Sequence, residues 1–238
     1  MTEATNLQDQ DRRVGIFDYR ELRLLLDPTS FVDQQIILHG AWEPAQLHYL
    51  FELVKEYDRE EKRTFLDIGA YFGLYSLLAA KTGLFSEIFA FEADRYTFGQ
   101  LQGNIFLNKF ERSIFARCAA ISDHSYEGNF WESRYHPEGN RGGVGLAFAP
   151  SSETTRVQCL ALDEVFDFSD RSLVIKVDVE GHEIHALSGM KRLLSENSVT
   201  LQVEAYEASQ KPLFELAEKL KLRHLNTINV DHYFVNWK

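Results

Sequence analysis

Apolar residues along this chain fall into short continuous runs that alternate with sets spaced three or four residues apart. The runs predict buried strands, and the spaced sets predict helices with one buried face. Strands are expected at residues 65–68, 88–91, 114–121, 157–160, 173–177 and 199–203. Helices are expected at 74–81, from Asp94 onward, at 162–165, from Ile184 onward and at 212–220, with a closing hairpin at 225–230 and 233–237. This order predicts an α/β protein with a mainly parallel twisted sheet, helices on both faces and a C-terminal antiparallel hairpin.

The segment before the first predicted strand has a different pattern. Residues 17–26 carry leucines with helical spacing, and this helix would end at Asp27 because the residue before a proline avoids the helical region. Residues 36–38 predict a short extended piece, and Pro44 can occupy the first turn of a helix. We therefore expect an N-terminal extension or cap at 1–40, followed by one domain at 41–238.

Composition and charge restrict the partners of this domain. With 238 residues, 45% of them hydrophobic, the chain can bury one substantial core. The formal net charge of -11 makes nucleic acid or an anionic membrane an unfavourable partner, and stable membrane insertion is not expected because long apolar runs are missing. Cys118 and Cys159 lie in apolar runs, which predicts reduced core residues and a cytoplasmic setting.

A strand, glycine loop and helix unit occupies residues 64–76. Gly69 and Gly73 would let the backbone approach a nucleotide closely. A dinucleotide site would favour G-x-G-x-x-G, whereas this loop has Gly-x-x-x-Gly, with Asp67 at the strand end, where a carboxylate repels a pyrophosphate. Asp67 suits a cationic nucleoside such as S-adenosyl-L-methionine, and Glu92 ends the next strand where it can accept hydrogen bonds from ribose hydroxyls. An ordinary α/β crossover with capped helices remains the alternative.

Acidic residues follow strand after strand in this pattern. Parallel strands joined by right-handed crossovers place all their carboxyl ends on one edge of the sheet, where ligands bind in open α/β folds. Isolated charges at such partly desolvated positions are costly unless they have a function. The residues concerned are Asp67, Glu92, Asp123, Asp178 and Glu204.

Several segments together resemble the FkbM family of class I S-adenosylmethionine-dependent methyltransferases. The matching segments are FLDIGAYFGLYS, FAFEA, the Asn104/Asn108 pair, AAISD, CLALDEV, VIKVDVEGHE and LQVEAY, with Trp42-Glu43-Pro44 as the approach segment. The resemblance extends from about Gly40 to Tyr206, and the family usually has asparagine in place of Tyr71 and proline in place of Ala93. It implies a Rossmann-like class I methyltransferase fold and O-methylation of a hydroxyl on a sugar, glycolipid or polyketide-type molecule.

The pattern and the resemblance together give a set of expected site residues. Cofactor contacts are expected from Glu43, Asp67, Gly69, Ala70, Tyr71, Gly73, Tyr75, Glu92, Ala93, Asn104, Ser122, Asp123 and Asp178. Asp178, Glu180 and His182 are the candidate catalytic residues, because a hydroxyl is a poor nucleophile until a base takes its proton. Asp178 could instead hold only the cofactor's ammonium group, Glu180 could stabilise a helix start, and His182 could be a surface residue. Asp178, Glu180, His182 and Glu204 could also form a divalent-metal site, but their spacing is not diagnostic, and we expect none.

Residues 124–155 break the strand and helix pattern and would leave the third strand at the ligand edge. A segment of this length is more often a functional loop or hairpin than filler, so we expect an acceptor-binding insertion rather than a surface insertion. Acceptor contacts are expected from Trp42, Trp131, Tyr135, His136 and Glu204. The expected partner is a small-molecule or glycan hydroxyl acceptor, and a homodimer is left open. The alternative functions are a binding protein that has lost its chemistry and an NAD-dependent oxidoreductase.

Overall fold

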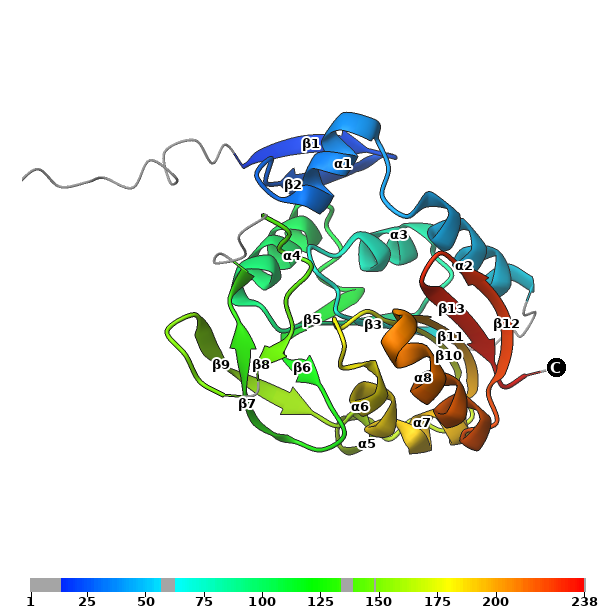
Figure 1. Ribbon diagram of the computed structural model, residues 1–238. Helices are drawn as coiled ribbons and strands as arrows, with labels where there is room; N and C mark the ends of the chain where they lie inside the picture. Colours follow the sequence, from blue (N-terminus) through cyan, green and yellow to red (C-terminus); the bar gives the residue numbers. More distant parts are fainter. Residues whose placement is uncertain (1–13, 57–62, 134–138, 148, 238) are drawn as a thin grey trace, which may run out of the picture.

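A seven-stranded sheet forms the centre of the molecule, in a computed structural model that describes residues 14–56, 63–133, 139–147 and 149–237. Its strand order is β12-β13-β11-β10-β3-β4-β5 (Figure 1). The parallel strands are β3 (Arg63–Ile68), β4 (Glu87–Glu92), β5 (Ile114–Cys118), β10 (Ser172–Val177) and β11 (Ser198–Glu204). The chain closes with β12 (Arg223–Ile228) and β13 (Asp231–Val235), which pair antiparallel, and β13 pairs antiparallel with β11. The expected Rossmann-like class I methyltransferase fold with its C-terminal hairpin is confirmed.

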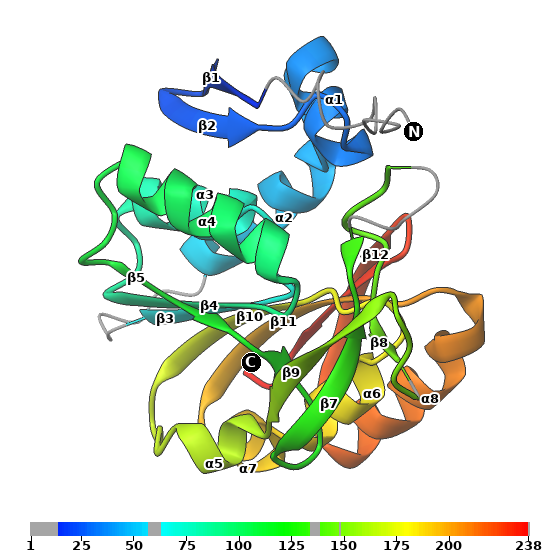
Figure 2. The same cartoon turned by 90° about the vertical axis from the view of Figure 1, so that its left-hand side faces the viewer.

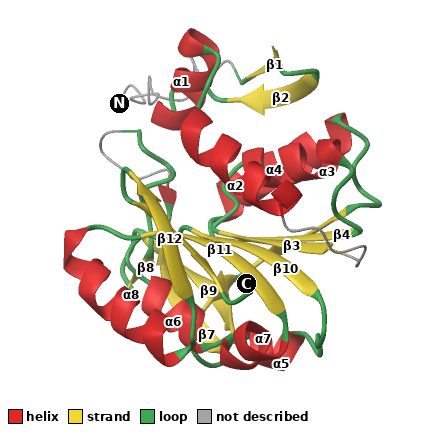
Figure 3. Cartoon of the chain, turned by 90° about the vertical axis from the view of Figure 1, so that its right-hand side faces the viewer, coloured by secondary structure: helices red, strands yellow, loops and turns green. Residues whose placement is uncertain are grey.

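Helices cover both faces of this sheet (Figures 2 and 3). One face carries α2 (Pro44–Glu56), α3 (Leu74–Thr82) and α4 (Arg95–Leu107), and the other carries α5 (Leu162–Val165), α6 (Glu183–Ser188), α7 (Lys191–Glu196) and α8 (Glu207–Lys219). Successive strand residues face opposite sides. Phe65 and Val174 therefore pack with the first set of helices, and Leu66 and Ile175 with the second. Both faces are apolar, as expected for a covered parallel sheet.

The predicted N-terminal helix at 17–26 is wrong. The structure has a hairpin of β1 (Gly15–Tyr19) and β2 (Leu22–Leu26), turning at Arg20 and Glu21 with φ of 47° and 66°. Leu22, Leu24 and Leu26 are buried, a period of two that belongs to a strand. The extended piece predicted at 36–38 is also wrong, because α1 (Phe31–His39) buries Val32 and Ile36 one helical turn apart.

A second sheet accounts for the rest of the chain between β5 and α5. Its order is β6-β9-β7-β8, from β6 (Ala120–Ile121), β7 (Tyr126–Trp131), β8 (Leu146–Ala147) and β9 (Thr154–Leu160). The strand predicted at 114–121 is thus divided between the two sheets. The predicted helix from Ile184 is divided into α6 and α7. The two carboxylate oxygens of Asp163 accept the backbone N–H groups of Arg192 and Leu193, and these bonds start the second helix.

Within the described ranges, the protein has no helix with the length and apolar character needed to cross a membrane.

Candidate active site

A cavity of about 280 Å³ opens at the carboxyl edge of β3, β4, β10 and β11. Expected cofactor residues that line it are Glu43, Asp67, Gly69, Ala70, Tyr71, Tyr75, Glu92, Ala93 and Asp178. The same wall contains the other candidate catalytic and acceptor residues Trp42, Glu180, His182 and Glu204. Residues far apart in the sequence therefore meet at the sheet edge that the strand order predicts.

Other expected site residues lie away from the cavity wall. Asn104 is fully buried, where its Oδ1 accepts the Leu25 N–H at 2.5 Å and its Nδ2 donates to the Phe72 carbonyl at 3.0 Å, so it holds the N-terminal hairpin on α4. Gly73 is the N-cap of α3. Ser122 and Asp123 lie just beyond the lining strand β6, and Trp131 is 41% exposed. Tyr135 and His136 fall outside the described residues.

The glycine loop brings the end of β3 against the end of β10. Gly69 has a φ of 82°, and its N–H donates to the Phe91 carbonyl at 2.9 Å. A Cβ at this position would lie 1.7 Å from the Asp178 carbonyl oxygen, so a side chain does not fit. Asp67 is 1% exposed, and its Oδ2 accepts the Ser76 N–H at 3.0 Å and the Ser76 hydroxyl at 2.6 Å. Burial raises the pKa of Asp67, while Lys176 lowers it.

Glu92 is held by the backbone of the two loops that follow β3 and β4. Its Oε2 accepts the Tyr71 N–H and its Oε1 accepts the Asp94 N–H, both at 2.8 Å. Burial raises the pKa of Glu92 to about 7. A carboxylate has about four lone-pair sites, so Glu92 can still accept a further hydrogen bond in the cavity.

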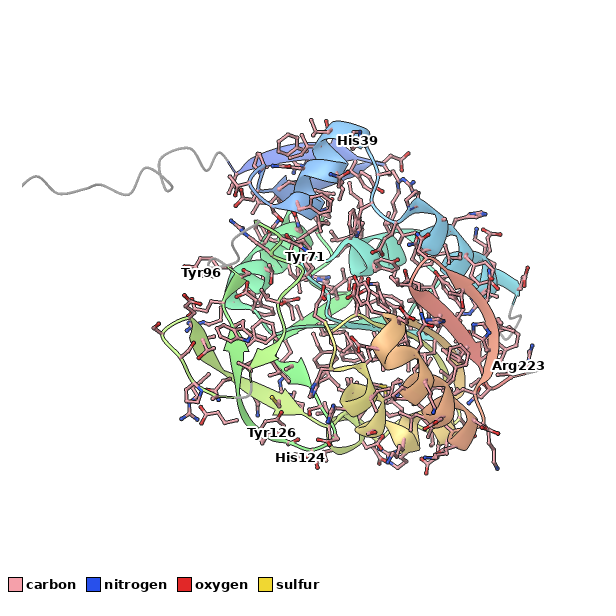
Figure 4. All side chains as sticks on the ribbon, viewed as in Figure 1. His39, Tyr71, Tyr96, His124, Tyr126 and Arg223 are labelled. Carbon is pink, nitrogen blue, oxygen red and sulfur yellow. The ribbon has the colours of Figure 1, made fainter. Side chains whose placement is uncertain are left out.

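Tyr71 connects the glycine loop to the N-terminal elements. Its hydroxyl lies 2.5 Å from the Ser30 Oγ and donates to Asp33 Oδ1 at 3.2 Å. Figure 4 labels Tyr71 below the α1 segment, in the interior of the molecule. Phe31 and Val32, at the start of α1, also line the cavity, so the N-terminal segment forms part of its wall. Sequence reasoning did not identify these two residues.

Three acidic side chains gather at the ends of β10 and β11. Asp178, Glu180 and Glu204 each offer an oxygen within 4.8 Å of the others, close enough for one cation to touch all three. Burial, and after it Asp178, raises the pKa of Glu204 to about 9, and burial raises the pKa of Glu180 to about 7. The crowding of acidic groups at this half-buried position therefore favours the protonated form of Glu204.

His182 precedes α6 and faces a polar neighbour. Its Nε2 lies 2.9 Å from the Ser122 Oγ, and its ring stacks on His185 at 4.4 Å with an interplanar angle of 7°. Burial, and after it His185, lowers the pKa of His182 to about 4. The imidazole is neutral at pH 7, so one ring nitrogen retains a lone pair.

Lys176 and Tyr206 also line the cavity, and sequence reasoning did not select either. Lys176 interrupts an apolar strand, which is a signal that could have identified it. The Tyr206 hydroxyl lies 3.4 Å from Glu204 Oε1.

The chain is similar to several known proteins. Solved structures similar to the chain include methyltransferase FkbM from Methylobacillus flagellatus KT, with 21% identity, a TM-score of 0.49 and coverage of 80% of this chain but 50% of that one. Others are the human methyltransferase 10 domain containing protein (14% identity, TM-score 0.47, 82% and 81% coverage) and precorrin-6y C5,15-methyltransferase from Geobacter metallireducens GS-15 (16%, 0.46, 82% and 88%). No curated protein matches the chain. The model of the methyltransferase FkbM domain matches residues 67–225, more than half of the sequence. The chain therefore belongs to the FkbM methyltransferase family.

Proposed function

We propose that this methyltransferase binds S-adenosyl-L-methionine in the cavity and methylates a hydroxyl oxygen of a sugar, glycolipid or polyketide-type small molecule. The observation that carries this proposal is the convergence of the Gly69 loop, Glu92 and Asp178 on one cavity. The family supplies the reaction class. The acidic wall supports a cationic cofactor and disfavours the phosphates of NAD.

The wall residues fit this cofactor in size and charge. Gly69, Ala70 and Ala93 line the cavity with little side-chain bulk. The free lone pairs of Glu92 can accept hydrogen bonds from ribose hydroxyls. Asp178 offers a carboxylate to an ammonium group.

The chain supplies alignment, exclusion of water and removal of a proton. S-adenosyl-L-methionine, when bound, supplies a methyl group already activated by its sulfonium. Alignment of the acceptor oxygen is the largest contribution expected from the protein. Asp178, Glu180 and His182 are the groups that can take the hydroxyl proton, and His182 is neutral at physiological pH.

Other residues of the cavity wall support a small organic acceptor. The Trp42 and Phe31 rings meet edge to face with centroids 6.0 Å apart, and Tyr206 and Glu204 lie on the same wall. Aromatic faces beside hydrogen-bonding groups suit a sugar ring or a polyketide. The acidic residues and the charge of -11 disfavour a nucleic-acid acceptor.

We also propose a cytoplasmic setting, on the basis of the cysteines. Cys118 and Cys159 are free thiols, which supports a reducing, cytoplasmic compartment. The homodimer remains a prediction.

Titration calorimetry with S-adenosylhomocysteine, S-adenosylmethionine and NAD tests the cofactor. Binding of the first two and not of NAD is expected, and a lack of binding at millimolar ligand would remove the assignment. Transfer of a labelled methyl group to a panel of sugars, glycolipids and polyketides then tests the acceptor class, with Asp178→Asn as the impaired variant. Chelation should leave turnover intact because we expect no metal at this site, whereas a metal-assisted hydroxyl would lose its lowered pKa without the ion. Cofactor binding without transfer to any hydroxyl would instead indicate a binding protein.

A further inference from the structure

Lys176 is a buried cation directly beneath the candidate site. It is 5% exposed and lies on β10, whose other residues are apolar except for Ser172 at its start. In the sheet register it pairs with Asp67 on β3 and Gln202 on β11, so these three polar side chains form a row across neighbouring strands. Burying such a row costs free energy unless its members satisfy one another.

The ammonium group of Lys176 has defined partners. Its Nζ donates to Asp178 Oδ2 at 2.6 Å, with side chains 6% and 23% exposed, and lies 4.5 Å from the centre of the Tyr75 ring. The Tyr75 hydroxyl donates to Glu43 Oε2 at 2.7 Å. These contacts hold the lysine between the end of its own strand and α3, which leaves its head little freedom.

A second layer of hydrogen bonds surrounds this centre. Gln202 Nε2 donates to the Tyr75 hydroxyl at 3.2 Å and to Asp231 Oδ1 at 2.7 Å, and Gln46 Nε2 donates to Asp231 Oδ2 at 3.3 Å. The network therefore joins α2, α3, β10, β11 and β13 behind the cavity wall. A change at its centre would alter the hydrogen bonds of several wall residues at once.

In this network one lysine lies among several acidic groups. Burial alone would lower the pKa of Lys176, but Asp178, Glu43 and Asp67 raise it well above its usual value. Burial raises the pKa values of Glu43, Asp67 and Asp231, and Lys176 lowers each of them. The remaining titratable groups that interact with it or with these carboxylates are Tyr75, Glu180, Glu204 and Tyr233. Without the lysine, these buried carboxylates would have to take up protons or repel one another.

We propose that Lys176 is a positioning residue: it fixes the Asp178 carboxylate on the cavity wall and supplies the opposite charge for the buried carboxyl groups of Glu43 and Asp67 behind it. The consequence for ligand binding rests on the proposed function, because a cationic cofactor needs that carboxylate charged and correctly aimed. The consequence for the ligand-free protein does not depend on it. Lys176 acts through these residues and takes no proton itself, since it stays charged.

The test compares the wild type with Lys176→Met, which keeps the approximate length of the side chain and removes its charge. The first measurement is the melting temperature of the ligand-free proteins at several pH values between about 5 and 8. In the variant the buried carboxylates should have folded-state pKa values raised further above their unfolded values. Stability from such groups is present below the unfolded pKa and is lost as pH rises through the folded pKa. The amount by which the melting temperature of the variant lies below that of the wild type, its deficit, should therefore widen with pH. Lys55→Met, which removes a surface lysine paired with Glu52, should show no such widening.

The second measurement is the dissociation constant of S-adenosylhomocysteine at the upper end of that range. We expect it to rise about tenfold or more in Lys176→Met, as for a lost charged hydrogen bond, with partial recovery in Lys176→Arg, which restores the charge. A difference in melting temperature between wild type and Lys176→Met that does not change with pH would overturn the positioning role. So would a difference that increases with pH while the dissociation constant stays the same. If the wild type does not bind S-adenosylhomocysteine, the proposed function fails, and the pH dependence of the deficit alone decides whether Lys176 organises the carboxylates. If Lys176→Met does not fold, Lys176→Gln, which keeps a donor without the charge, takes its place in both measurements.

Discussion

Three residues of the cavity wall have a left-handed backbone. Glu43, Tyr71 and Glu180 have φ values of 47°, 52° and 51°. Such conformations cost on the order of 1–3 kcal/mol each for residues other than glycine, and they persist where the surroundings enforce them. Asparagine, which the family usually has in place of Tyr71, tolerates this conformation better than tyrosine. Here the bonds from the Tyr71 hydroxyl to the N-terminal segment offset that cost.

The role of Glu92 can be tested by removing its side chain. Glu92→Ala should weaken S-adenosylhomocysteine binding by about 1–3 kcal/mol, because charge-assisted hydrogen bonds to the ribose would be lost. Calorimetry measures this change directly. Glu87 lies at the other end of the same strand and pairs with Arg171. Glu87→Ala should therefore leave the affinity unchanged. Equal affinities in all three proteins would show that Glu92 does not face the ribose.

The pH dependence of turnover can identify the base. Burial raises the pKa of Glu180 to about 7, so a base at this position becomes active as pH rises through that value. We expect kcat/KM to increase over this interval in the wild type. In Glu180→Gln the increase should disappear and the rate should fall by about 10²–10⁴-fold. An unaltered profile in the variant would show that Glu180 is not the base, and His182, whose pKa is about 4, would not account for an increase near neutrality.

At the scale of elements, the contact between the glycine loop and β10 is the tightest point of the site. A Cβ on Gly69 would lie 1.7 Å from the Asp178 carbonyl oxygen, at a φ of 82°. Gly69→Ala should therefore cost about 4 kcal/mol or more of stability, the range of severe steric changes. Denaturant unfolding measures it. Gly83→Ala has a similar φ of 68° but open space around its Cβ, so it should cost only about 1–2 kcal/mol. Similar losses in both variants would show that backbone strain, and not the close approach, matters.

The insertion at 124–155 meets the N-terminal segment above the cavity. The Phe31 N–H donates to the Gly139 carbonyl at 3.2 Å, and Arg141 forms an ion pair with Asp27 with side chains 10% and 3% exposed. Asn140, Arg141 and Gly142 line the cavity. This placement supports a role of the insertion in enclosing the acceptor.

Shortening the insertion tests that role. Replacing residues 134–143 with a short Gly/Ser link should leave the affinity for S-adenosylhomocysteine nearly unchanged and abolish methyl transfer to the acceptor, because Glu92, Asp67 and Asp178 stay in place. Replacing the exposed residues 150–153 in the same way should alter neither property. Loss of cofactor binding in a shortened protein that keeps its melting temperature would assign the insertion to the cofactor site.

At the scale of the whole molecule, acidic groups around the cavity connect stability to pH. The pKa values of Glu92 and Glu180 are raised to about 7 and that of Glu204 to about 9, from an ordinary value of 4.5. Their folded values exceed their unfolded values, so their contribution to stability is present at low pH and lost as pH rises through the folded values. His182 acts in the opposite direction, since its contribution is lost as pH falls below 6.5 toward about 4.

Three raised carboxyl groups outweigh the one histidine above the ordinary carboxyl pKa of 4.5, so the melting temperature of the ligand-free protein should decrease from about pH 5 to about pH 9. Scanning calorimetry across this range measures the decrease. Glu204→Gln, which cannot ionise, should flatten the upper part of the curve. A melting temperature that increases steadily up to pH 9 would show that these carboxyl groups are charged in the folded protein.

The sequence by itself determined the central sheet and the cofactor side of the site. Buried parallel strands produce short apolar runs, and the residue that follows each run must lie at the carboxyl edge. Asp67, Glu92, Asp178 and Glu204 could be placed at one edge for this reason, and the structure brings all four to one cavity. The motif at 173–183 also carried the family resemblance, because local order along the chain is sufficient to recognise it.

Only the tertiary structure decided which other segments complete the cavity. The leucines of the N-terminal segment fit a helix and a strand pattern, and packing of β2 against α4 selected the strand. No local feature of the sequence shows whether Asn104 contacts a ligand or the backbone of Leu25, because the same side-chain amide would make either contact. The contacts of Phe31, Lys176 and Arg141 join segments that are distant in the sequence. Such contacts depend on the relative position of whole elements, which the local pattern of polar and apolar residues does not encode.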